Sequence, residues 1–412
     1  MAIDTFSVLM LFSVTIFLGY FGSLFFHKTR ISDAFWLLVF GLMIGPVFHV
    51  VDPSPFTAAL PLLSALAVII ILFDSGLNME FYEVMREAPR SMLLAVLEIL
   101  LTIVVVGYLS MALFKFTALQ GMLLGAMLGG TCTSTIGSIV NKIRMSEDLK
   151  TVLGLSAILN GPMSLVLSIA LINEIVATGT GSALSTIFAA FSIGGVIGLF
   201  LGIVWMAILD GIKGRPFDYM ITLAVIFIMY VFVESIGGSG AIAALVFGLV
   251  LGNSDTFSRI LKTQHMFTPD LLVKKFNVEA SFFMNAFFFM YVGLAATINL
   301  SYIIYGMLIT AWLVIARLIA VGISTIGMRL TKLEMNISNS LIPRELTVAV
   351  IAQLPAVYGI KGAEVYSNLA FIVIILSILY TTFATRVFYN PNKPAAPAVA
   401  TPMKPAGIRP RK

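Results

Sequence analysis

Blocks of about 20 apolar residues follow one another along nearly the whole chain, and each is long enough to cross about 30 Å of hydrocarbon as an α-helix. Charged residues, glycines and prolines separate these blocks. Hydrophobic residues make up 59% of the sequence and charged residues only 11%, which is too few to cover a soluble fold. The sequence therefore predicts an all-α, polytopic membrane protein, with a transmembrane domain over residues 1–390.

The charged residues, glycines and prolines between the apolar blocks divide this domain into about 13 predicted transmembrane helices. The first apolar run has no Lys or Arg before it and is too long for a signal peptide, so we interpret it as the first span. The predicted spans cover residues 5–26, 34–51, 57–77, 90–114, 118–141, 149–177, 185–209, 217–235, 238–253, 278–297, 301–328, 337–359 and 365–388.

The distribution of basic residues predicts the orientation of these spans. With the N-terminus outside, most of the 25 Lys and Arg residues fall in inside loops and the tail, and only Lys115 and Lys361 fall in outside loops. Because cytoplasmic loops are enriched in Lys and Arg, we expect a multi-pass protein of the plasma membrane with its C-terminus in the cytoplasm. Residues 391–412 are rich in Pro, Ala and basic residues, which predicts a disordered basic cytoplasmic tail.

Several function classes do not fit this sequence. No P-loop signature is present, so we expect neither an enzyme nor a pump driven by ATP through this chain alone. The basic residues lie in short loops, which argues against a nucleic-acid partner. A single cysteine, Cys132, excludes an intrachain disulfide, and three scattered histidines predict no metal site. We expect a secondary transporter in a lipid bilayer that uses no cofactor.

Charged residues within the predicted spans are costly in a membrane and mark a transport pathway by default. Glu98 and Arg317 are also explained by structural hydrogen bonds or ion pairs between helices. Arg344 and Glu345 are adjacent in one short stretch beside a proline, which favours a functional role. Asp74 is a further candidate in the third span.

Three spans contain sequences that break or kink helices. In the fifth span, Gly129-Gly130 precedes the small polar run Thr131–Thr135. A break there would offer carbonyls to a cation and amides to an anion, although small residues also allow close helix packing. The sixth span contains Asn160-Gly161-Pro162, which predicts a kink. The twelfth is irregular around Pro343 and Pro355, and breaks in corresponding positions of two halves are typical of a transporter site.

Several stretches together resemble the monovalent cation:proton antiporter superfamily, the NhaP-like sodium/proton exchangers. The resemblance extends over about residues 5–388. It implies an NhaA/NhaP-like antiporter fold with inverted repeats and discontinuous crossing helices, and a homodimer. The stretches are Ile71–Asn78, Glu234–Ala241 with Gly248–Asn253, Phe287–Leu294, and Pro343-Arg344 with Ala349–Pro355.

The resemblance also implies an ion site at the breaks. Thr131 matches the unwound threonine of the fifth helix, Asn160 the Asn/Thr position of the sixth-helix motif, and Arg344 the core arginine. Asp74 matches an acidic position of the third helix. The predicted ion- or substrate-binding residues are Thr131, Cys132, Thr133, Ser134, Ser156, Asn160 and Gly161.

The sequence departs from the family pattern at the acidic positions of this site. Gly161 replaces the ion-binding aspartate, and Ser156 replaces the glutamate expected to pair with the core arginine. Cys132 replaces an acid that many members carry in the fifth helix. Glu345 follows Arg344 where glycine is usual. A buried Arg344 without its usual partner would be costly enough to require a new one.

Three hypotheses follow, because exchange needs a group that binds either a proton or a cation, and amides and hydroxyls cannot do so near neutral pH. In the first, Glu345 or Asp74 supplies the missing carboxylate, and a monovalent cation such as Na⁺ or Li⁺ is exchanged for H⁺. In the second, a site with Arg344 and no acid transports an anion or a neutral solute. In the third, the protein is a transport-inactive sensor or structural partner. The first is favoured.

Overall fold

The computed structural model consists of helices and connecting segments, with no strand among the residues that it describes. The tail predicted over residues 391–412 lies outside this part of the chain. The structure describes residues 13–22, 32–53, 56, 60–79, 81–140, 142–143, 145–176, 183–212, 218–260, 271–297, 299–344 and 346–388.

Each of the predicted spans contains at least one helix. The helices are Ser13–Gly22, α2 (Asp33–Leu42) with the π-helical turn η1 (Met43–Val47), α3 (Leu60–Asn78), α4 (Phe81–Phe114), α5 (Ala118–Met127), α6 (Thr133–Val140), α7 (Glu147–Val176), α8 (Ala183–Ile212), α9 (Asp218–Ser235), α10 (Gly240–Gly252), α11 (Ser254–Ile260), α12 (Leu271–Leu294), α13 (Leu300–Ser324), α14 (Lys332–Ser340), α15 (Leu346–Ile351), α16 (Leu354–Val357) and α17 (Ala363–Phe388).

Among the described residues, helix length and composition identify fewer membrane crossings than the sequence pattern predicts. Within the described ranges, 6 helices are long and apolar enough to cross a membrane, or 7 if α10 and α11, bent by 80°, form one span. The other predicted spans contain apolar helices of 10–17 residues. A helix of that length is shorter than the hydrocarbon core. The prediction of about 13 crossings is therefore not confirmed by length and composition.

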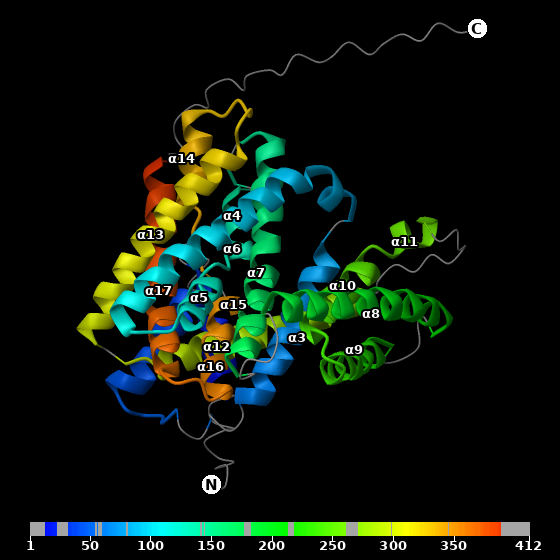
Figure 1. The fold of residues 1–412 in the computed structure, drawn as a ribbon, viewed down its shortest axis with the longest axis horizontal. Coiled ribbons are helices and arrows are strands. Elements are labelled where there is room, and N and C mark those ends of the chain that lie inside the picture. The colour runs from blue at the N-terminus through cyan, green and yellow to red at the C-terminus, as the bar shows by residue number, and fades with distance from the viewer. Residues whose placement is uncertain are drawn as a thin grey trace, which may run out of the picture.

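The helices pack as two groups that lie on opposite sides of the view in Figure 1. In the first group, α4 contacts α5, α7 and α13, and α13 contacts α17. In the second group, α10 contacts α3, α8 and α9. The short helix α15 belongs to neither group alone, because it contacts α7 and α17 as well as α3 and α12. The breaks described below therefore lie where the two groups meet.

Close backbone packing holds α3 against α10. A Cβ atom at Gly76 would overlap the carbonyl oxygen of Leu245, and one at Gly248 would overlap that of Phe73. The Asn253 side chain, just after α10, donates a hydrogen bond from Nδ2 to the carbonyl oxygen of Met79, just after α3, at 2.6 Å. Two of the stretches that carry the family resemblance are thus packed together, and they determine where the end of α3 lies.

The helix breaks predicted in the fifth and twelfth spans are present, and they meet. Helix α5 ends at Met127 and α6 begins at Thr133, while residues 341–344, which follow α14, are also non-helical. The Cys132 amide donates a hydrogen bond to the Pro343 carbonyl oxygen at 2.7 Å, which joins the two breaks directly. By contrast, α7 is continuous through Pro162, so the irregularity predicted there does not interrupt the helix.

Candidate ion site at the helix breaks

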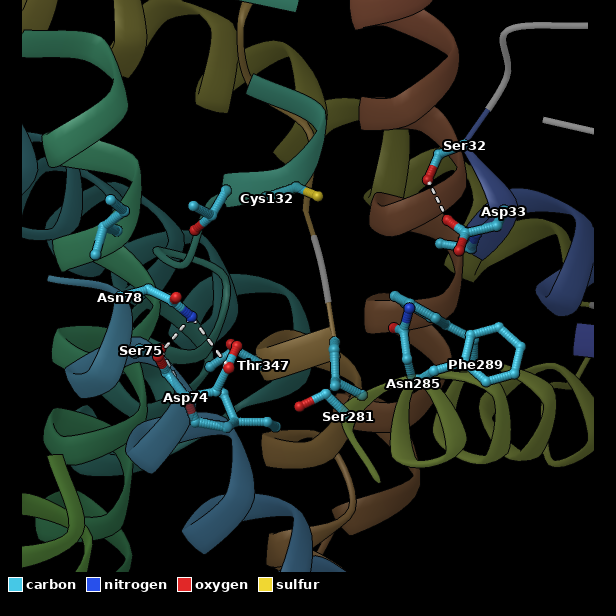
Figure 2. Close-up of a pocket in the computed structure, with 16 residues that line it drawn as sticks. Ser32, Asp33, Asp74, Ser75, Asn78, Cys132, Ser281, Asn285, Phe289 and Thr347 are labelled. Atoms are coloured by element: carbon cyan, nitrogen blue, oxygen red, sulfur yellow. Dashed lines mark hydrogen bonds between the residues drawn. The ribbon is translucent and has the colours of Figure 1, made fainter. Parts of the chain in front are cut away.

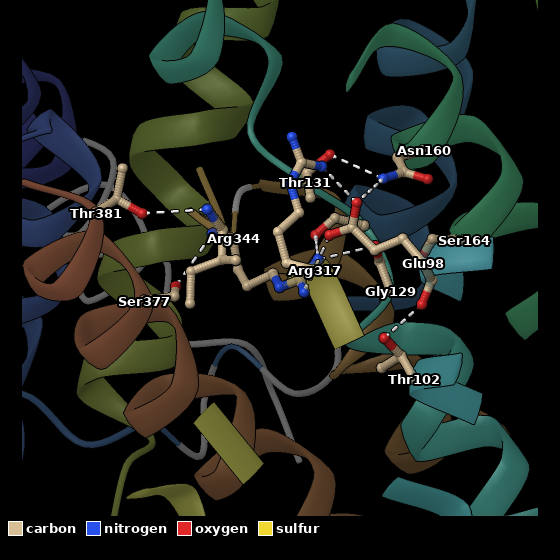
Figure 3. Close-up of polar contacts among 12 residues, drawn as sticks. Glu98, Thr102, Gly129, Thr131, Asn160, Ser164, Arg317, Arg344, Ser377 and Thr381 are labelled. Carbon is tan, nitrogen blue, oxygen red and sulfur yellow. Dashed lines mark hydrogen bonds and ion pairs between the residues drawn. The ribbon is translucent and has the colours of Figure 1, made fainter. Parts of the chain in front are cut away.

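Glu98 lies at the centre of a buried charge cluster next to the first break. Its Oε2 accepts a hydrogen bond from Nη1 of Arg317 at 2.6 Å, and its Oε1 lies 3.6 Å from Nη2 of Arg344. All three side chains are 0% exposed, and Figure 3 shows them converging from α4, α13 and the segment before α15. Arg344 therefore has a partner, and this partner comes from α4 rather than from α7.

Arg344 is held in place by the break itself. Its Nη1 donates to the carbonyl oxygens of Gly129 at 2.8 Å and Gly130 at 2.9 Å. Its backbone N–H donates to the Ser377 hydroxyl of α17 at 3.1 Å. The break leaves these glycine carbonyls without the partners that a continuous helix would give them. The guanidinium, with several donors in a planar fork, supplies those hydrogen bonds.

Asn160 connects this charge cluster to the polar run of the break. Its Nδ2 donates to Glu98 Oε2 and to Thr131 Oγ1, each at 3.1 Å. Asn160 and Thr131 are both buried, at 0% exposure. We call Glu98, Thr131, Asn160, Arg317 and Arg344 the buried cluster. It contains two guanidinium groups and one carboxylate, so it carries one positive charge in excess.

Asp74, Cys132 and Thr133 line a cavity of about 530 Å³ between α3, α6, α12 and α15 (Figure 2). Asp74, which is half-buried, accepts a hydrogen bond at Oδ1 from Asn78 Nδ2 at 3.1 Å. Thr133 donates from its hydroxyl to the Ala157 carbonyl oxygen of α7 at 3.2 Å. No member of the buried cluster is among the described residues that line this cavity.

Comparison with known proteins agrees with this geometry. The model of the family described as "Sodium/hydrogen exchanger, transmembrane" matches residues 13–389. This chain belongs to the sodium/hydrogen exchanger family. The sodium proton antiporter MjNhaP1 from Methanocaldococcus jannaschii, solved at pH 8, superposes with a TM-score of 0.77 over 93% of this chain and 98% of its own, at 20% identity. The predicted antiporter fold is therefore confirmed.

Several antiporters are similar to this chain in amino-acid sequence. The K(+)/H(+) antiporter NhaP2 of Shewanella baltica is 27% identical over 329 residues, which cover 77% of this chain and 55% of the relative. The Probable Na(+)/H(+) antiporter 2 of Methanocaldococcus jannaschii is 25% identical over 309 residues, 70% of this chain and 71% of the relative. This chain thus spans about half the length of the NhaP2 relatives.

The remaining predicted residues lie in α6 and α7, or outside the described part of the chain. Ser156 is buried in α7 and donates to the Leu153 carbonyl oxygen of its own helix at 2.9 Å, so its hydroxyl is used locally. Gly161 is buried in the same helix next to Asn160. Ser134 lies in α6, where the structure describes its backbone only. Glu345 lies outside the described residues.

Sequence reasoning identified the charged residues but not which of them pair. The sequence offered each of Glu98 and Arg317 a structural role by itself, and the structure shows that the two form an ion pair with each other. Nothing in the sequence indicated that Glu98 also faces Arg344. Asp33, which lines the cavity opposite Asp74, gave no signal because it stands at the end of a span. Among the described residues, no group of three or more His, Cys, Asp or Glu is arranged to hold a metal.

Proposed function

We propose that this protein exchanges a monovalent cation such as Na⁺, Li⁺ or K⁺ for protons across the membrane, rather than catalysing a reaction. The observation that carries the proposal is the cavity that brings the Asp74 carboxylate to Cys132 and Thr133 at the helix break. A carboxylate suits exchange because a proton and a cation compete for the same lone pairs. The names of the relatives, which are K⁺/H⁺ and Na⁺/H⁺ antiporters, support the same reaction.

Asp74 suits the exchange step better than Glu98 does. Protonation of Glu98 would leave the two buried guanidinium groups of Arg317 and Arg344 without their counter-ion, which is strongly unfavourable. Asp74 is half-buried at a cavity, where a proton or a cation can reach it. We therefore assign the exchanging carboxylate to Asp74. Glu345, the other predicted candidate, is tested beside it.

The cavity also suggests which side of the membrane the site faces. Its lining includes Asp33 at the start of α2 and Asn78 at the end of α3. Both are adjacent to loops that the Lys and Arg bias predicts to be cytoplasmic. We propose an inward-facing state of a plasma-membrane protein with its N-terminus outside. The homodimer implied by the family is part of the proposal, and light scattering of the purified protein tests it.

Transport by purified protein in liposomes with an imposed pH gradient tests the function. Sodium, lithium or potassium chloride is added in turn while an internal dye reports pH. We expect a saturable, cation-dependent collapse of the gradient, reduced at least about a hundredfold by Asp74→Asn. Glu147→Gln is the matched control, because it removes a carboxylate that is 85% exposed and paired with Lys150.

Two outcomes would change the proposal. Full activity in Asp74→Asn together with its loss in Glu345→Gln would move the exchanging carboxylate to Glu345. No collapse with any of the three cations, in protein shown to be folded and inserted, would refute cation/proton exchange. Uptake of anions would then be measured, because the buried cluster has an excess positive charge.

A further inference from the structure

We infer that Glu98 is a positioning residue that orients the Asn160 side chain, so that the amide oxygen of Asn160 is presented as a ligand for a cation at the helix break. The inference rests on the proposed function, because it places a transported cation at the break. It adds to that function a residue of α4, Glu98, which is distinct from Asp74, the carboxylate assigned to the exchange step.

The Glu98 carboxylate faces a guanidinium group with each of its two oxygens. Oε2 is in a 2.6 Å ion pair with Arg317, and Oε1 faces Arg344 at 3.6 Å. A carboxylate in such a pair accepts hydrogen bonds and donates none. Whatever polar group is placed against Glu98 must therefore turn a donor toward it.

The Asn160 side chain makes its hydrogen bonds through the amide nitrogen. An asparagine amide has two N–H donors on nitrogen and an acceptor oxygen. In this structure Nδ2 makes both of its hydrogen bonds, one to Glu98 and one to Thr131. The oxygen atom Oδ1 is buried and has no hydrogen-bond partner among the described residues. A buried acceptor without a partner is rare and needs an explanation.

Glu98, rather than Thr131, decides the orientation of the Asn160 amide. Thr131 presents a hydroxyl, which can either accept or donate, so it tolerates both orientations of the Asn160 amide. Glu98 tolerates only one, because a reversed amide would place Oδ1 against the carboxylate. The two arginines that hold Glu98 thus act on Asn160 through it. The outcome is an uncharged oxygen atom on α7, next to Thr131 of the first break, in a helix where Gly161 contributes no carboxylate.

An oxygen ligand of this kind fits a monovalent cation. Alkali cations are bound by carbonyl, amide and carboxylate oxygens, and the amide nitrogen would repel them. A bound cation would be coordinated by the Oδ1 oxygen of Asn160, which has no hydrogen-bond donor among the described residues. The proposed ligand is therefore set by the pairing of α4 with α13 and the second break, not by α7 alone.

The test is the cation-dependent thermal stabilisation of the purified full-length chain in detergent. A ligand that binds only the folded state raises the unfolding temperature, and the rise grows with the logarithm of one plus the ratio of ligand concentration to Kd. Lithium, sodium and potassium chloride are titrated separately, with choline chloride holding the ionic strength constant. The variants are Glu98→Gln and the double variant Glu98→Gln/Arg317→Gln. The double variant removes one charge of each sign, so the cluster keeps its single excess positive charge.

We expect wild-type protein to be stabilised by at least one cation, and both variants to need at least about tenfold more of it for the same stabilisation. Thr102→Val is the matched control, since Thr102 is buried on α4 and donates only to the backbone oxygen of Glu98. It should retain the wild-type cation dependence. If neither neutral variant folds, Glu98→Asp, which keeps the charge but shortens the side chain by one methylene, should show the same shift.

The inference is overturned if the double variant or Glu98→Asp titrates as wild type does, or if no cation stabilises the wild-type chain. The liposome assay separates this result from the proposed function. Stabilisation by a cation without exchange in liposomes would refute the function and leave the role of Glu98 intact. Exchange that proceeds with an unchanged cation dependence in the Glu98 variants would refute only the role of Glu98.

Discussion

Thr131 and Cys132 are neighbours in the chain, yet their side chains belong to two different environments. Thr131 is 0% exposed and accepts a hydrogen bond from Asn160 in the buried cluster. Cys132 lines the cavity, where it faces the same space as Asp74. The non-helical backbone at the break allows this division, because consecutive residues of an unwound segment can point to opposite sides.

Two kinds of charged site are therefore separate in this structure, namely the ion pairs of the buried cluster and the Asp74 carboxylate at the cavity. The buried cluster contains an ion pair that must persist, since breaking it would leave a buried charge alone. The cavity is lined by the Asp74 carboxylate and by no member of the buried cluster among the described residues. The family pattern places acidic residues on the sixth helix, where this chain has Ser156 and Gly161. Here Glu98 supplies the partner of the arginine from another helix.

The largest expected effect is the loss of stability on breaking the buried cluster. Arg344→Ala should lower the free energy of unfolding by about 3–5 kcal/mol, because it removes a buried counter-ion of Glu98 and two hydrogen bonds to glycine carbonyls. Thermal unfolding in detergent measures it. Arg259→Ala, at an exposed position in the last turn of α11, is the control and should have almost no effect. An unchanged melting temperature in Arg344→Ala would mean that Arg344 is hydrated.

Thiol labelling probes the two sides of the break directly, because Cys132 is the sole cysteine. A small methanethiosulfonate reagent should reach Cys132 through the cavity. Thr131→Cys in a Cys132→Ser background should react at least about thirtyfold more slowly, since labelling then requires a local opening of about 2 kcal/mol. Mass spectrometry follows both reactions, and denatured samples give the reference rates. Equal rates in the folded proteins would contradict the division.

Introducing an acidic residue on α7, at the position where the family pattern has one, should strengthen cation binding next to the buried cluster. Gly161→Asp places a carboxylate next to Asn160 and should strengthen sodium or lithium binding about tenfold. The concentration dependence of thermal stabilisation reports the change. Gly154→Asp adds the same charge to the same helix in open space, and it should not alter binding. If Gly161→Asp also leaves the affinity unchanged, the break is no longer a cation site.

The smallest expected effect concerns how the first break is anchored. Ser164 of α7 donates its hydroxyl hydrogen bond to the Ala126 carbonyl oxygen at 2.6 Å, next to the end of α5. Ser164→Ala should therefore lower the free energy of unfolding by about 1 kcal/mol. Ser168→Ala is the control, because that buried hydroxyl has no hydrogen-bond partner among the described residues. A loss as large in the control would show that the anchor contributes nothing specific.

The sequence alone determined the class of the protein and the places where its helices break. Runs of apolar residues are local features, and their length predicts spans whatever their neighbours are. Gly129-Gly130 and Pro343 likewise disfavour a continuous helix through their own backbone chemistry. The order and spacing of the short motifs were enough to indicate the exchanger family, which the family match over residues 13–389 confirmed.

Only the tertiary structure decided which charges meet. Glu98 is 219 residues from Arg317 and lies in a different helix from the acid that the family pattern led us to expect, so no local pattern connects the two. The same holds for Asp74 and Cys132, which stand far apart in the chain and line one cavity only in the folded structure. Helix formation depends on nearby residues, whereas the partner of a buried charge depends on how distant helices pack.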